Sequence, residues 1–367
     1  AETNFAPAGL NYEAARADTY HQLTLPVTMF GWLNFIPRVG GRATYYSEAT
    51  GTGATTDANT RTVLNTGAEL TFKASQTWPG IRNQLLDLDG VRHIIEPSVN
   101  YVYVPKPSNR PKDLPQFDYE LPSLRMLPLE FTDYNSIDSI DSENVIRFGL
   151  KNKLQTKRDG QVDDFLRWEV FTDWRLQTRT NQMDFGERRV ETNTVTLGAR
   201  QNTFSDLYSD FTLKPRSWLR LDSQTRFDVN VGQWRMLLHT VTLAPNDTWS
   251  WTVGHFYLRS QIGTNVIDRT GLGEGNNLIT SSLFYRLNEN WGVRANHHFD
   301  ARNGRMQEQF YTLYRDLRSW TAALTAGVRD NGVGPKDYTI AFTFSLKASP
   351  KFPVGGDTVN HLSLLGR

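Results

Sequence analysis

The sequence predicts an all-β fold, an antiparallel transmembrane β-barrel. Alternate residues of 165–179 sort into an apolar face, with Trp168 and Trp174, and a charged face, with Arg167 and Asp173. Successive side chains of a strand point to opposite sides of its sheet, so this segment has one apolar and one hydrated wall. Ordinary strands have about five or six residues, and this one is longer. The same alternation recurs along the chain, as expected of a wall between lipid and water.

The composition agrees with a barrel. The mean hydropathy of −0.51 is polar, yet the chain holds 10 Trp, 14 Tyr and 20 Phe. Half of each barrel strand faces a polar lumen, which lowers the average hydropathy, and aromatic residues form girdles at the two membrane interfaces. The chain has no run of about 18 apolar residues that would indicate a membrane helix.

Charge and cysteine content exclude other classes. A net charge of +1 lacks the basic footprint of a nucleic-acid-binding protein, so no nucleic-acid partner is expected. With no cysteine, the chain holds neither a disulfide nor a Cys-ligated metal. It begins at Ala1 without a signal peptide, and we interpret it as a portion of a longer protein.

The alternation predicts about sixteen strands within a barrel domain of residues 1–347, followed by a C-terminal tail, 348–367. In order, the predicted strands are 19–30, 33–47, 60–74, 91–104, 143–157, 164–179, 189–201, 205–214, 217–230, 233–244, 248–261, 277–287, 291–301, 306–316, 319–329 and 337–347. Rows expected to face lipid include Leu23 with Leu25, Leu219 with Leu221, Trp320 with Leu324, and Ile340 with Phe342.

The connections alternate in length, as in an antiparallel meander. Short turns such as 215–217 and 288–290 contrast with longer loops such as 48–59 and 263–276. In outer-membrane barrels the short turns face the periplasm and the long loops face outward.

One connection, 105–142, is long and contains six prolines, the first of them Pro105. Such length is uncommon for a connection without regular structure. The sequence supports two interpretations equally: an external loop, or a loop that folds into the lumen and narrows it.

Three segments carry a resemblance to a known family: 93–105, with a Glu-Pro strand ending in Tyr-Val-Tyr-Val-Pro; 114–118, ending in Phe-Asp; and 131–144. Together they resemble the C-terminal barrel portion of the lipopolysaccharide-assembly outer-membrane protein family (LptD/OstA). The residues matching its motifs are Glu96, Pro97, Phe117, Asp118, Asn135, Asp138 and Trp320. The chain departs from the family at Arg318 and Ser319, where many members carry adjacent cysteines, so their disulfide switch is not carried over.

The resemblance implies a translocon of the cell outer membrane that inserts lipopolysaccharide into the outer leaflet through a lateral opening in the barrel. It implies lipopolysaccharide and outer-membrane lipid as partners, a plug lipoprotein inside the barrel, and a periplasmic bridge protein reached through an upstream domain. Family barrels have about twenty-six strands, so we expect this chain to form part of a larger barrel. Closure as a barrel of about sixteen strands stays open.

Two alternatives belong to other classes. A general diffusion porin or substrate channel of about sixteen strands needs neither plug nor upstream domain. A soluble β-sandwich would fold without detergent.

No enzyme is predicted, and the chain shows no catalytic, cofactor-binding or metal site. His297 and His298 are adjacent in a strand, so they point to opposite faces and cannot share a metal ion. The glycines of 271–275 lack the Lys-Ser/Thr of a phosphate loop and predict a turn.

The polar face supplies candidates for a glycolipid path. Arginine pairs bidentately with phosphate and carboxylate. The lumen-facing candidates are Arg167, Arg175, Arg179, Arg220, Arg226, Arg235 and Arg294. Acidic residues are interleaved with them, so the plainer interpretation is a ladder of ion pairs that holds the wall together.

Overall fold

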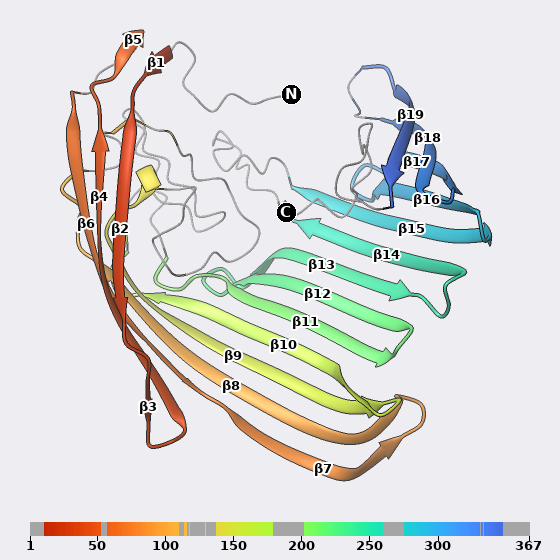
Figure 1. Ribbon diagram of the computed structural model, residues 1–367, viewed down its shortest axis with the longest axis horizontal. Helices are drawn as coiled ribbons and strands as arrows, with labels where there is room; N and C mark the ends of the chain where they lie inside the picture. The colour runs from red at the N-terminus through yellow and green to blue at the C-terminus, as the bar shows by residue number, and fades with distance from the viewer. Residues whose placement is uncertain are drawn as a thin grey trace.

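A single curved antiparallel sheet holds nearly all of the strands (Figure 1). The computed structural model describes residues 11–52, 57–109, 114–115, 117, 129, 137–178, 202–259, 275–330, 332 and 334–347. The strands of the sheet are β2 (Arg16–Thr24), β3 (Val27–Met29), β4 (Leu33–Tyr46), β6 (Asn59–Phe72), β7 (Ala74–Asn83), β8 (Leu88–Val104), β9 (Glu143–Arg158), β10 (Gln161–Arg175), β11 (Leu207–Arg216), β12 (Leu219–Asp228), β13 (Gln233–Leu243), β14 (Trp249–Leu258), β15 (Asn276–Asn288), β16 (Trp291–Asp300), β17 (Arg305–Asp316), β18 (Trp320–Arg329) and β19 (Asp337–Leu346).

The strands pair with their neighbours along the chain, in the order of a barrel wall. No register among the described residues joins β19 to β2, and Figure 1 shows these strands at opposite ends of the arc. Apolar side chains at the two ends are the more exposed, Leu23 at 72% and Ile340 at 84%, against 43% for Leu283 within the wall. An unpaired strand edge is unstable in hydrocarbon, so both ends need a strand partner in the membrane.

The two predicted faces are confirmed by the registers. Leu221, Val241 and Val253 are direct partners on one side of the wall. Asp222 pairs with Thr240 on the other. Because direct partners share a face, the separation between an apolar and a polar side continues from strand to strand.

The strand prediction was wrong in three places. β7 was missed because its polar run and Pro79 break the alternation, and every residue in it is exposed. A small two-stranded sheet of β1 (Asn11–Glu13) and β5 (Thr50–Thr52) extends into a stretch predicted as loop. The first predicted strand is divided into β2 and β3 at Pro26.

The predicted strand 189–201 and the tail 348–367 lie outside the described residues. β10 pairs directly with β11 in antiparallel register, from Leu166 opposite Leu213 to Phe171 opposite Tyr208. The wall therefore passes from one to the other with no strand between them.

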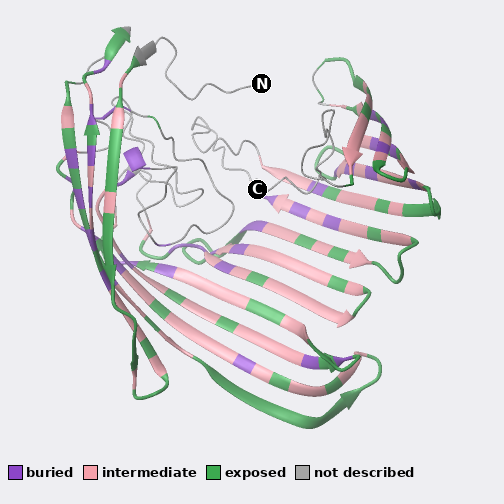
Figure 2. Ribbon diagram, in the orientation of Figure 1, coloured by how far each residue is buried: buried purple, intermediate pink, exposed green. Residues whose placement is uncertain are grey.

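Long and short connections lie at opposite ends of the strands, as predicted. Figure 2 shows the buried residues gathered toward the long-loop ends, whereas β7 is exposed throughout. Among the described residues the helical element is the 3-10 turn η2 (Ile137–Ser139). None of the helices in the described part is long and apolar enough to cross a membrane.

The orientation of the wall gives a first testable prediction. Leu283 and Ser282 are neighbours in β15 on opposite faces, Leu283 outward and 43% exposed. Leu283→Arg is expected to lower the free energy of unfolding in lipid by about 2–4 kcal/mol, because it moves a charge into hydrocarbon. Ser282→Arg adds the same charge on the lumenal face and should cost much less. Urea unfolding in lipid vesicles measures both, and equal losses would contradict the assignment of faces.

Candidate functional site

The charged face of the wall is its inner face. η2 lies on the concave side of the sheet in Figure 1, and its Asp138 accepts a hydrogen bond from Tyr46 Oη at 2.5 Å. Tyr46 is fully buried, whereas its neighbour Tyr45 is 48% exposed on the opposite side. Polar residues that share a face with Tyr46 therefore line the concave side.

Two of the predicted lumenal arginines form exposed ion pairs within their own strands. Arg167 Nε lies 3.1 Å from Glu169 Oε1, and Arg220 Nε lies 2.7 Å from Asp222 Oδ2. Each acid is two residues further along the strand and so shares the arginine's face. Such exposed pairs contribute little to stability.

Three other predicted arginines, Arg175, Arg226 and Arg235, are buried at the long-loop end of the inner wall. Arg235 lies 2.6 Å from Asp228 Oδ2 and 3.1 Å from Asp206 Oδ1. Arg226 Nε lies 3.3 Å from Asp206 Oδ2, and its guanidinium lies 4.3 Å from the ring centre of Tyr208. We call Asp206, Tyr208, Arg226, Asp228 and Arg235 the buried charge network.

Asp206 was not among the predicted site residues. It lies within the predicted strand 205–214, but the sequence candidates include arginines only; the structure begins β11 one residue later, at Leu207. Burial raises the pKa of its carboxyl, and the two adjacent arginines act against that shift. The network joins three strands, β11, β12 and β13, and its charges compensate one another at a place where uncompensated charge is costly.

A second buried cluster attaches part of the long loop 105–142 to the inner wall. Asp138 has no exposed surface. It accepts hydrogen bonds from Tyr46 Oη, from Arg16 Nη1 at 3.0 Å and from the Phe117 backbone N–H at 2.7 Å. Arg61 donates to the backbone carbonyl oxygens of Ile137 and Asp138 at 3.1 and 3.2 Å. We call this cluster the loop clamp.

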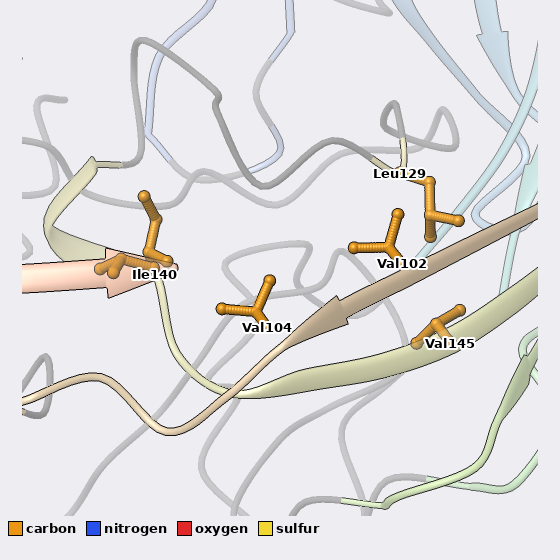
Figure 3. Close-up of a cluster of buried hydrophobic side chains, with 6 residues drawn as sticks. Val102, Val104, Leu129, Ile140 and Val145 are labelled. Atoms are coloured by element: carbon orange, nitrogen blue, oxygen red, sulfur yellow. The ribbon is translucent and has the colours of Figure 1, made fainter. Parts of the chain in front are cut away.

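Apolar contacts accompany the loop clamp. Figure 3 shows Leu129 and Ile140 of the loop beside Val102, Val104 and Val145 of the wall. These residues form one buried cluster together with Val63. The contacts favour the lumenal interpretation for this part of the loop; most of its other residues lie outside the described ones.

Arg294 differs from the other predicted cations. It lies on the inner face of β16 beside the rings of Phe284 and Tyr314, with its guanidinium 5.5 Å from each ring centre. No ion pair of Arg294 occurs within the described part of the chain. Arg179, the remaining candidate, lies outside the described residues.

The family-motif residues have separate positions. Phe117 and Asp138 meet in the loop clamp, and Trp320 lies 41% exposed at the short-turn end of β18. Asp118 and Asn135 lie outside the described residues.

Glu96 and Pro97 lie where the partner of β8 changes. β8 pairs with β6 from residue 98 onward and with β7 up to residue 95. Proline lacks the N–H that a ladder needs, so Pro97 fits the gap between the two pairings. Glu96 forms an ion pair with Lys73 at 3.0 Å across the same gap.

The predicted separation of the two adjacent histidines holds. His298 is buried on the inner face with Glu308 at 3.0 Å, whereas His297 contacts Tyr311 on the outer face. Within the described residues, no group of three or more His, Cys, Asp or Glu side chains is arranged to hold a metal ion.

Comparisons with known proteins identify a family and one distantly similar structure. A model of the family described as LPS transport system D (LptD) matches residues 2–313. Among solved structures, the chain is similar to one titled "Copper transporter OprC", with 10% identity and a TM-score of 0.34. That match covers 92% of this chain and 59% of the other, so the chain spans less than two thirds of that protein. A search of curated proteins finds no match.

Proposed function

The chain belongs to the LptD family of the LPS transport system, and on that premise we propose that it forms the wall of a lateral-exit translocon. The family places it in the outer membrane with a role in lipopolysaccharide assembly. In the proposal, lipopolysaccharide enters the lumen from the periplasmic side and leaves sideways, between the first and last strands of the barrel, into the outer leaflet.

The observation that carries the proposal is the two-sided wall with a free edge at β19. Its outer rows are apolar, and its inner rows are charged and hydrogen-bonded, as a path for a glycolipid headgroup requires. Among the described residues β19 pairs with β18 alone, so its other edge is available as one side of a seam for lateral exit. The strand on the other side of that seam would be the first strand of the complete barrel, because a complete ladder offers no gap to the lipid.

The proposal includes partners and a mode of action. A plug lipoprotein would fill the lumen, and a bridge protein would deliver lipopolysaccharide through an upstream domain. The resemblance supports both, and the concave wall supports the plug by offering a large inner surface. We further propose that the protein is not an enzyme and moves its substrate without chemical conversion.

The test uses the natural full-length protein in cells. Its depletion is expected to stop the arrival of new lipopolysaccharide at the cell surface, measured by an enzyme that modifies lipid only in the outer leaflet. Complementation should restore arrival. The porin alternative predicts unchanged arrival and a steady conductance of the purified protein in planar bilayers, and that result would overturn the proposal.

A further inference from the structure

Arg294 is held in a fixed position by aromatic rings. The rings of Phe284 and Tyr314 are 6.2 Å apart in an edge-on arrangement, and the guanidinium lies 5.5 Å from both. Phe284 is its direct cross-strand partner in β15, and Tyr314 projects from β17 on the same face. Flanking rings orient a guanidinium by cation–π attraction without using its hydrogen-bond donors.

Glycine makes the arrangement possible. A Cβ added at Gly292 would lie 3.1 Å from Phe284 Cε2, closer than ordinary van der Waals contact. Gly292 is the direct partner of Tyr314, so the small residue leaves room for the Phe284 ring between neighbouring strands.

The acids on the inner face of the neighbouring strand β17, four residues to either side of Thr312 opposite Arg294, are already engaged. Asp316 forms an ion pair with Lys347 at 2.7 Å. Glu308 lies 3.0 Å from His298 and 2.7 Å from Arg329. Arg294 Nε is buried and has no hydrogen-bond partner among the described residues. A buried donor without an acceptor is costly, so an acceptor that reached the guanidinium would lower this cost.

The other predicted arginines that the structure describes are engaged. Arg167 and Arg220 have acids in their own strands, Arg226 and Arg235 have Asp206, and Arg175 donates to the backbone carbonyl of Asn202 at 3.1 Å. Contacts that hold the wall together account for the positions of those arginines, but they do not account for Arg294. Arg286 lies on the same face of β15 as Phe284, and its charge acts on Asp316.

We propose that Arg294, framed by Phe284 and Tyr314, is a subsite for a phosphate monoester carried by the glycolipid as it enters the lumen. Arginine binds phosphate through two parallel N–H donors, and prior orientation by the rings lowers the entropy cost of binding. The site lies toward the short-turn end of the wall, which faces the periplasm in outer-membrane barrels. The inference rests on the proposed function and names a contact of the substrate.

The experiment uses the natural full-length protein in detergent micelles. The probe is a fluorescent, phosphorylated glucosamine-disaccharide glycolipid, compared with the same glycolipid after phosphatase treatment and with inorganic phosphate as competitor. In the unmodified protein, removal of the phosphate should weaken binding about tenfold. In Arg294→Gln the two glycolipids should bind nearly equally, and Arg294→Lys should retain part of the difference.

Arg329→Gln is the matched control, because it removes an equal charge from the same inner face, where Arg329 forms an ion pair with Glu308 at 2.7 Å. It should keep the full preference for the phosphorylated probe. Gly292→Ala keeps Arg294 but crowds Phe284. This variant should show a weaker preference for the phosphorylated probe. Folding of each variant is checked by heat-modifiable migration.

The outcomes separate the two proposals. A preference that survives in Arg294→Gln overturns the subsite and leaves the translocon standing. Failure of the unmodified protein to bind either glycolipid counts against the translocon itself. Equal competition by inorganic phosphate and by the glycolipid would show a general anion site, which also overturns a subsite for the lipid headgroup.

Discussion

Replacing Arg235 by methionine is expected to lower the free energy of unfolding by about 3–5 kcal/mol. Arg235 lies between Asp206 and Asp228, whose side chains are 1% and 0% exposed. Methionine keeps much of the volume and removes the charge, so Asp228 loses its 2.6 Å partner. Removing one member of a buried ion pair leaves the other uncompensated, and this costs far more than the pair contributes as a whole.

Equilibrium unfolding in lipid vesicles measures this effect, with Arg220→Met as the control. Arg220 has the same charge and a similar ion pair, but its side chain is 55% exposed, so its loss should cost about 0–1 kcal/mol. Similar losses in the two variants would show that the buried charge network contributes no more than a surface pair.

Replacing Asp138 by alanine is expected to release the loop from the wall and to cost about 3–5 kcal/mol. The carboxylate accepts from Tyr46 Oη, Arg16 Nη1 and the Phe117 N–H. Without it, Arg16 loses its ion pair at 3.0 Å and the buried Tyr46 hydroxyl loses its acceptor. The apolar contacts of Leu129 and Ile140 remain, so a weakened attachment rather than complete unfolding is the expected result.

Hydrogen exchange of the Phe117 amide reports the release directly, since that N–H donates to Asp138. Exchange should accelerate at Phe117 and stay unchanged in the middle of β15. Asp222→Ala, which disturbs an exposed ion pair, should leave the Phe117 rate unaltered. Slow exchange at Phe117 in Asp138→Ala would mean that the apolar cluster alone holds this part of the loop.

Much of the wall could be predicted because side-chain alternation is local. The faces of β10, with Trp168 and Trp174 outward and Arg167 and Asp173 inward, follow from residue order alone. β7 escaped prediction for the same reason. Its polar run and Pro79 interrupt the alternation, so residue order alone gives no apolar row there.

The candidate site could likewise be predicted only in part. Its arginines could be assigned to the inner face by counting, but their partners could not. Tyr46 and Asp138 are 92 residues apart, and the order of the strands decides that they meet. The same holds for Asp206, which precedes β11, and Arg235 in β13.

The sequence by itself determined the two-sided character of the strands and the class of residues on each side. A period of two residues needs no knowledge of neighbours, and the solvent on each side selects the side chains. The tertiary structure alone decided which inner charges are compensated, where the loop attaches and that Arg294 Nε has no hydrogen-bond partner among the described residues. Those outcomes depend on cross-strand register, which places residues from distant parts of the chain within a few ångströms of one another.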